Sequence, residues 1–131
     1  MSESMNPDTN QRDELFKAFG RAFFRQDLDA MYQVVTEDFA YSIEVDGETR
    51  VMTSSEEVGA FFKERKGTRS DVRFEDVVFH HAPEATFMTY RITGTDTASG
   101  KAFERVGVER YTFRDAKIAE KDVYSRPIPP S

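Results

Sequence analysis

Residues 101–126, KAFERVGVERYTFRDAKIAEKDVYSR, predict two long β-strands joined by a tight turn at Asp115 and Ala116. Successive side chains of a strand point to opposite faces of its sheet. One face of the first strand then carries an acid among mostly aromatic side chains: Phe103, Arg105, Gly107, Glu109, Tyr111 and Phe113. A carboxylate on such a face costs free energy unless it is paired, protonated or in contact with a ligand. Glu109 is therefore the first candidate for a functional residue.

The opposite face of the same strand carries Val106, Val108, Arg110 and Thr112. A long apolar row on an exposed sheet face favours burial, and a twofold interface is the commonest way to bury it. We therefore expect Val106, Val108 and Thr112 to lie on the outer sheet face and to form a homodimer with a second copy of the chain.

The segment before these strands predicts helices and one strand. An amphipathic helix is expected over about residues 10–25, and Asp27 is expected to cap a short second helix that contains Leu28, Met31, Tyr32 and Val35. Phe39, Tyr41, Ile43 and Val45 alternate with other residues, which predicts a strand that ends in a turn at Asp46 and Gly47. Ser54 and Glu57 form a capping-box pattern that opens a third helix, with Val58, Phe61 and Phe62 on one face and an end at Gly67.

Four successive antiparallel strands are then predicted over residues 72–81, 85–95, 101–114 and 117–126. Residues 1–8 are expected to form a disordered leader, residues 9–126 a single domain, and residues 127–131, PIPPS, a tail that cannot continue a sheet. A chain of 131 residues is large enough for one core of its own.

Composition limits the possible functions. The net charge of -6 disfavours nucleic acid and anionic membranes as partners, and no signal peptide or membrane-spanning run is visible. The absence of cysteine excludes disulfides and thiolate catalysis and is typical of a cytoplasmic protein. His80 and His81 are the only histidines, and we find no motif for a metal, a nucleotide or a flavin, so no cofactor is expected.

The order of these elements resembles the cone-shaped α+β fold shared by nuclear transport factor 2, ketosteroid isomerase and the SnoaL-like polyketide cyclases. The resemblance covers about residues 10–126 and rests on FGRAFFRQDLDAMYQVVTEDFAY (residues 19–41), RITGTD (residues 91–96) and ERYTFRDAKIAEKDVYS (residues 109–125). It implies three N-terminal helices packed in a strongly bent antiparallel sheet, around a deep apolar pocket that takes a small-molecule ligand.

The resemblance also implies roles for single residues. Glu109 stands where the isomerase has the protonated acid of its oxyanion hole, but Ile43 stands at the position of the base and Phe19 at that of the oxyanion tyrosine. Neither can replace the residue it aligns with, so no steroid double-bond isomerisation is expected. The cyclases pair their acid with a histidine near the position of Asp96. This sequence has no histidine there, so only the acid of the cyclase pair is present.

If no bulge shifts the last strand, Asp122 and Tyr124 also face the pocket. We then expect Glu109, Asp122 and Tyr111 as candidate catalytic residues, and a ligand-binding set of Phe19, Phe23, Phe39, Tyr41, Ile43, Phe61, Phe62, Phe103, Arg105 and Tyr124. Glu109 could instead pair with Arg105, two positions away on the same face, or with another base across the sheet. Three functions stay open: a cofactor-free isomerase, cyclase or lyase; a ligand carrier or sensor; and a dimerising module whose pocket is filled by its own Phe side chains.

Overall fold

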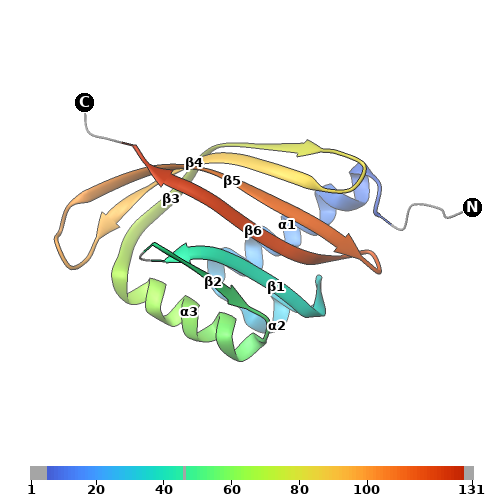
Figure 1. The fold of residues 1–131 in the computed structure, drawn as a ribbon, viewed down its shortest axis with the longest axis horizontal. Helices are drawn as coiled ribbons and strands as arrows, with labels where there is room; N and C mark the ends of the chain where they lie inside the picture. Colours follow the sequence, from blue (N-terminus) through green and yellow to red (C-terminus); the bar gives the residue numbers. More distant parts are fainter. Residues whose placement is uncertain (1–5, 46, 129–131) are drawn as a thin grey trace, which may run out of the picture.

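The computed structural model describes residues 6–45 and 47–128, which form three helices and one six-stranded sheet in an α+β arrangement (Figure 1). In chain order the elements are α1 (Thr9–Arg25), α2 (Leu28–Met31), β1 (Val35–Val45), β2 (Glu48–Met52), α3 (Ser55–Thr68), β3 (Arg69–His81), β4 (Thr86–Asp96), β5 (Ala102–Arg114) and β6 (Lys117–Pro127).

The sheet has the strand order β2-β1-β6-β5-β4-β3. The four predicted strands β3 to β6 are confirmed as successive antiparallel neighbours. The sheet is mixed rather than purely antiparallel, because β1 pairs with β6 in parallel. This pairing brings together two segments that are far apart in the sequence, as the adjacent ribbons of β1 and β6 in Figure 1 show.

The three helices follow the predicted order of two helices, a strand and a third helix, with one additional strand, β2, before α3. Only α1 and α2 precede the strands, α2 has four residues, and α3 follows β2. Val35, expected in the second helix, is the first residue of β1, because α2 ends at its C-cap Tyr32. The strand β2 was not predicted. Of the predicted turn before it, Asp46 lies outside the described residues and Gly47 has a positive φ of 82°, which favours glycine.

Local capping explains where the helices begin. Asp8 caps α1: its side chain accepts a hydrogen bond from the backbone N–H of Gln11, and the Gln11 side chain accepts one from the Asp8 N–H, both at 2.8 Å. Asp27 caps α2 as predicted, and Ser54 caps α3. The last strand also reaches further than expected, since Pro127 belongs to β6 and the Ile128 N–H donates to the Glu104 carbonyl.

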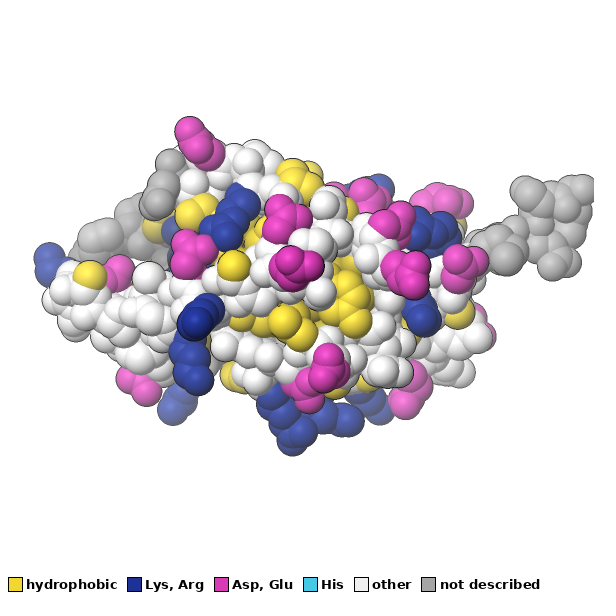
Figure 2. Space-filling view, turned by 90° about the horizontal axis from the view of Figure 1, so that it is seen from below, with side chains coloured by type: hydrophobic (Ala, Val, Ile, Leu, Met, Phe, Trp, Pro, Cys, Tyr) yellow, Lys and Arg dark blue, Asp and Glu magenta, His cyan; other side chains and the backbone are white. Residues whose placement is uncertain are grey.

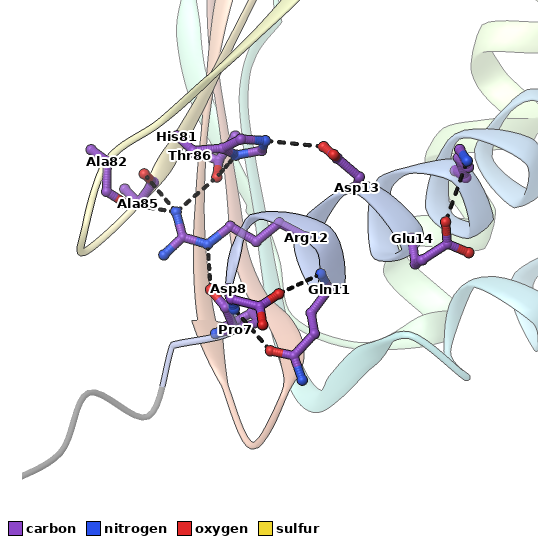
Figure 3. Close-up of polar contacts among 11 residues, drawn as sticks. Pro7, Asp8, Gln11, Arg12, Asp13, Glu14, His81, Ala82, Ala85 and Thr86 are labelled. Carbon is purple, nitrogen blue, oxygen red and sulfur yellow. Dashed lines mark hydrogen bonds and ion pairs between the residues drawn. The ribbon is translucent and has the colours of Figure 1, made fainter.

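The N-terminal end of α1 is fixed to the turn between β3 and β4 by a buried arginine (Figure 3). The Arg12 guanidinium donates hydrogen bonds to Thr86 Oγ1 and to the backbone carbonyls of Pro7, Ala82, Pro83 and Ala85. His81 joins the same network, 2.9 Å from Thr86 Oγ1 and 3.1 Å from Asp13 Oδ1. Pro7 and Asp8 are therefore part of the folded domain, whereas residues 1–5 of the expected leader lie outside the described residues.

The core lies between α1, α3 and one face of the sheet. Phe16 and Phe19 of α1 contact Tyr111 of β5, with ring centroids 4.8 and 5.9 Å apart, and Phe61 of α3 contacts Tyr41 of β1 at 5.6 Å. The predicted alternation of β5 is confirmed, because Glu109, Tyr111 and Phe113 are buried whereas Val108 is exposed. Figure 2 shows one outer face of the molecule, on which charged side chains of both signs flank hydrophobic ones.

The strand β6 contains a β-bulge that changes which side chains face the core. Phe113 pairs with Ile118, but Thr112 pairs with Glu120, so Ala119 is an extra residue on β6. Ile118 and Ala119 are consequently both buried although they are adjacent in the strand. Beyond the bulge, the odd-numbered residues of β6 point to the inner face. Within the described residues, no helix is long and apolar enough to cross a membrane.

Candidate functional site

A cavity of about 760 Å³ opens between the C-terminal end of α1, the inner side of α3 and the inner face of the sheet. About half of its lining residues are apolar or aromatic: Phe23, Phe24, Tyr41, Ile43, Val45, Phe61, Phe62, Val72, Phe74, Tyr90, Ile92, Val123 and Pro127. Its ionisable wall residues are Arg25, Glu44, Arg65, Lys66, Arg69, Asp71, Arg105 and Glu109. Such a volume fits a small organic molecule.

Glu109 lies at the floor of this cavity and is 3% exposed. Its Oε1 atom accepts a hydrogen bond from the Tyr111 hydroxyl and lies 3.0 Å from Lys121 Nζ. Lys121 Nζ is also 3.4 Å from the Tyr111 hydroxyl, so the three side chains form one buried group. We call Glu109, Tyr111 and Lys121 the floor triad. Both contacts use Oε1, and Tyr90 on the cavity wall interacts with the same carboxylate.

Lys121 is almost fully buried and lies among aromatic rings. Its ammonium nitrogen is 4.0 Å from the ring centroid of Phe23, 5.0 Å from that of Tyr41 and 5.3 Å from that of Phe19. Burial lowers the pKa of Lys121, and the charge of Glu109 offsets part of this change. The rings and the acid together hold the ammonium in a place that water does not reach.

Two more tyrosines stand beside the floor triad on the cavity wall. Burial raises the pKa of Tyr41 and of Tyr90, and the negative charge of Glu109 raises both further. Tyr90 lies directly across from Gly107, where a Cβ atom would come within 2.5 Å of its ring and hydroxyl. Glycine at position 107 therefore makes room for the Tyr90 phenol next to Glu109.

The structure brings together most of the predicted site residues. Phe23, Tyr41, Ile43, Phe61, Phe62, Arg105 and Glu109 line the cavity. Phe19, Phe39 and Tyr111 belong to the packed core, and Phe103 packs at its edge. Of the two predicted partners for Glu109, Arg105 is wrong and a base across the sheet is confirmed, because Glu109 pairs with Lys121 of the neighbouring strand β6. Arg105 instead donates hydrogen bonds to the hydroxyl and the backbone carbonyl of Ser125, at 3.2 and 3.3 Å.

The predicted positions of Asp122 and Tyr124 in the pocket are also wrong. Asp122 lies on the outer face, where its carboxylate is 3.3 Å from Arg110 Nη1, and Tyr124 is 63% exposed. The bulge at Ala119 is the reason, since the one-residue shift turns Lys121, Val123 and Ser125 inward in their place. Lys121 was missed for the same reason. The adjacent apolar pair Ile118 and Ala119 was the one signal in the sequence that could have indicated it.

No group of three or more His, Asp or Glu side chains in the described ranges is arranged to hold a metal ion. The polar groups at the cavity floor are instead a carboxylate, an ammonium and phenols. This arrangement can bind a hydrogen-bonding group of a ligand or exchange a proton with it.

Comparison with solved structures finds the same fold in several bacterial proteins. A protein from Burkholderia xenovorans LB400, described as NTF2-like, has a TM-score of 0.78 at 20% sequence identity, over 91% of this chain and 92% of its own. A candidate polyketide cyclase from Xanthomonas campestris pv. campestris has a TM-score of 0.72 at 19% identity, over 88% and 90%.

A protein from Catenulispora acidiphila DSM 44928 with a ketosteroid isomerase-like fold, in complex with trimethylamine, has a TM-score of 0.69 at 16% identity, over 85% and 84% of the two chains. No curated protein matches the chain. The SnoaL-like domain family matches residues 16–121, which include α2, α3 and β1 to β5 in full. The chain shares its fold with the NTF2-like protein from Burkholderia xenovorans LB400, and it belongs to the SnoaL-like domain family.

Proposed function

We propose that the cavity binds a small, mostly apolar, polyketide-like molecule and that Glu109 transfers a proton on it, in a reaction of the isomerase, cyclase or lyase type. The observation that carries this proposal is the floor triad: a carboxylate faces an apolar cavity while Lys121 and Tyr111 hold one of its oxygens. A positioned carboxylate of this kind contributes about 10² to 10⁴ to a proton-transfer rate.

The geometry supports a simple sequence of proton steps. Glu109 Oε2 takes a proton from a carbon next to a carbonyl group, and the C–H electron pair moves into an enolate. Tyr41 or Tyr90, whose phenols stay neutral, donates a hydrogen bond to the enolate oxygen. Glu109 then returns the proton to another carbon and becomes a carboxylate again. Lys121 and Tyr111 do not move a proton and only keep the carboxylate oriented.

Hydrogen–deuterium exchange tests this proposal without knowledge of the natural substrate. A panel of apolar aromatic and alicyclic ketones is incubated with the protein in D2O, and deuterium uptake beside the carbonyl is followed by NMR. We expect catalysed uptake in at least one ketone and a loss of about 10² or more in Glu109→Gln. Glu104→Gln is the matched control, because Glu104 lies on the same strand and pairs outside the cavity with Arg91. Equal uptake in wild type and Glu109→Gln overturns proton transfer by Glu109.

A non-catalytic carrier or sensor is the second candidate. It is favoured by Ile43, which lines the cavity at the position where the related isomerase has its base. A carrier would bind members of the same panel, seen as a raised melting temperature, without any deuterium uptake. In either case we expect no turnover of a β,γ-unsaturated ketosteroid.

We also propose that the outer sheet face forms a twofold homodimer. Val108 is exposed there, and its cross-strand neighbour Tyr124 adds a second exposed apolar side chain to the predicted row. Sedimentation velocity at micromolar concentration should show a dimer that Val108→Lys converts to a monomer. A wild-type monomer under these conditions would rule the interface out.

A further inference from the structure

The cavity wall carries four arginines, and three of them are half-buried and come from three different elements. Arg65 lies in the last turn of α3, Arg69 is the C-cap of α3 and the first residue of β3, and Arg105 lies on β5. Their positions are fixed by contacts around the end of α3. Thr97, in the loop after β4, donates from its N–H to the Thr68 carbonyl at 3.0 Å and from its hydroxyl to the Gly67 carbonyl at 2.8 Å.

These three arginines differ from the other half-buried arginines in having no carboxylate of the described residues within ion-pair distance, although the charge of Glu64 acts on Arg65 and that of Asp96 on Arg69, and each opposes the lowering of the pKa. Arg50, Arg91 and Arg110 each form ion pairs with carboxylates outside the cavity. Within residues 6–45 and 47–128, Arg65 and Arg69 form no ion pair and their guanidiniums donate no hydrogen bond. Arg65 lies 4.9 Å above the Phe61 ring and Arg69 4.8 Å above the Phe103 ring.

The three charges are close enough to repel one another. Burial, together with the charges of Arg65 and Arg105, lowers the pKa of Arg69 to about 10. Burial also lowers the pKa of Arg65, and Arg105 adds to this effect. Glu109 cannot neutralise this cluster, because it is already paired with Lys121. The two other wall acids, Glu44 and Asp71, are exposed and form no ion pair with the cluster.

We propose that the cavity selects ligands that carry a carboxylate, which Arg65, Arg69 and Arg105 bind while the apolar body of the ligand extends towards Glu109. This inference rests on the proposed use of the cavity for a small molecule and names the class of that molecule. A planar carboxylate matches the paired N–H donors of a guanidinium, and an incoming anion relieves the repulsion among the three cations. The aromatic wall between the arginines and Glu109 fits an aromatic or aliphatic acid rather than a fully polar one.

Matched pairs of acids and neutral amides test this inference by calorimetry at low salt. The probes are 2-naphthoate with 2-naphthamide and decanoate with decanamide. The same aromatic body carrying a phosphate, 2-naphthyl phosphate, distinguishes a carboxylate site from a general anion site. We expect at least one acid to bind about ten times more tightly than its amide. The affinity for this acid should fall as the salt concentration rises, because salt screens the charges. The phosphate ester should bind more weakly than the acid.

The variants Arg65→Met and Arg69→Met should each weaken binding of the acid about tenfold and leave binding of the amide unchanged. Arg73→Met is the matched control, because Arg73 is an exposed arginine on the same strand as Arg69 and lies outside the cavity wall. Melting temperatures of all three variants should stay close to that of the wild type, which separates lost binding from lost folding.

The outcomes distinguish the two proposals. If an amide binds as tightly as its acid, or if Arg69→Met and Arg65→Met bind the acid like the wild type, the carboxylate site is overturned while the small-molecule cavity stands. If tighter binding of the phosphate ester depends on the same arginines, the preference for carboxylates is overturned in favour of phosphates. If neither member of any pair binds, both the carboxylate site and the proposed ligand-binding function fail.

Discussion

The arginines beside the two ends of α1 lie in opposite surroundings: Arg12 is buried at the N-terminal end, whereas Arg65 of α3 and Arg69 of β3 are half-buried at the cavity. At the N-terminal end, Arg12 donates hydrogen bonds to five oxygen atoms of the chain itself. At the C-terminal end, which lines the cavity, Arg65 and Arg69 have no hydrogen-bond acceptor among the described residues. Burial lowers the pKa of all three arginines, so each loses hydration in the folded state. Only at the N-terminal end of α1 do hydrogen bonds to the chain itself offset this loss of hydration.

This difference distinguishes Arg12, which stabilises the fold, from Arg65 and Arg69, whose role is not in folding. Arg12 connects α1 to the turn between β3 and β4, and its removal would leave backbone carbonyls without donors. Removal of Arg69 would leave no described partner unsatisfied. The contrast therefore predicts that substitutions at the two ends change different measurable quantities: the free energy of unfolding at the N-terminal end and ligand affinity at the cavity.

The largest effect on stability is expected between the two ends, in the floor triad. Glu109→Gln or Lys121→Met should each lower the free energy of unfolding by about 4 kcal/mol, because either change leaves one buried charge without its partner. Urea denaturation of the two variants and of the double variant gives the coupling energy. The double variant should recover much of the loss, since it contains neither charge. Full additivity of the two losses would show that Glu109 and Lys121 do not interact.

Arg12→Met should cost somewhat less, about 3 kcal/mol in the free energy of unfolding, because buried carbonyl groups lose their charged donor. The same urea measurement on Arg21→Met provides the control, since Arg21 is an exposed arginine on the same helix. If Arg12→Met is as stable as Arg21→Met, the N-terminal end does not depend on this network, and the contrast between the ends disappears.

Alkaline pH should destabilise the protein through the phenols around the floor triad. The pKa values of Tyr41, Tyr90 and Tyr111 are raised in the folded chain, mainly by burial, so the stability they contribute is present below pH of about 10 and is lost as the pH rises above it. Lys121 acts in the opposite direction, because its lowered pKa makes its contribution increase with pH. The three phenols should outweigh it.

Tyrosinate absorbance and far-ultraviolet circular dichroism, recorded along one titration, check this expectation. We expect the buried phenols to ionise in the same step in which secondary structure is lost. Ionisation of these phenols well before the loss of circular dichroism would show that water reaches the cavity floor more freely than its burial indicates.

The smallest effect on stability is expected at the cavity. Arg69→Met should change the free energy of unfolding by less than about 1 kcal/mol, or raise it, because the variant loses a repulsion and no hydrogen bond. Urea denaturation beside Arg12→Met compares the two ends directly. A loss at Arg69 as large as the loss at Arg12 would show that the cavity arginines also serve the fold.

The sequence predicted the hairpin of β5 and β6 and the inward position of Glu109, because strict alternation and a two-residue turn are local properties. The turn is confirmed by the positive φ values of Asp115 and Ala116. Periodicity could not reveal the bulge at Ala119, since one inserted residue shifts every later side chain without changing the local pattern. For this reason the predicted inward residues Asp122 and Tyr124 proved to be outward ones, and Lys121 was overlooked.

Strand β2 was missed for a different reason. Its five residues, Glu48–Met52, are mostly exposed, so they lack the alternation of apolar and polar side chains that marks a half-buried strand. The unpartnered state of Arg65 and Arg69 could not be predicted either. Whether an arginine has a partner depends on contacts between elements that are distant in the sequence.

The parallel pairing of β1 with β6 has a consequence for the order of folding. Tyr41 pairs with Lys121 across this junction, 80 positions further along the chain, and both lie at the cavity floor. Such long-range contacts form only after a large loop has closed, whereas the hairpins of β3 to β6 need only local closures. The floor is therefore expected to assemble late, after the hairpins. A ligand that binds only to the complete floor would then slow unfolding without speeding folding. Such a ligand would increase the kinetic stability of the folded protein.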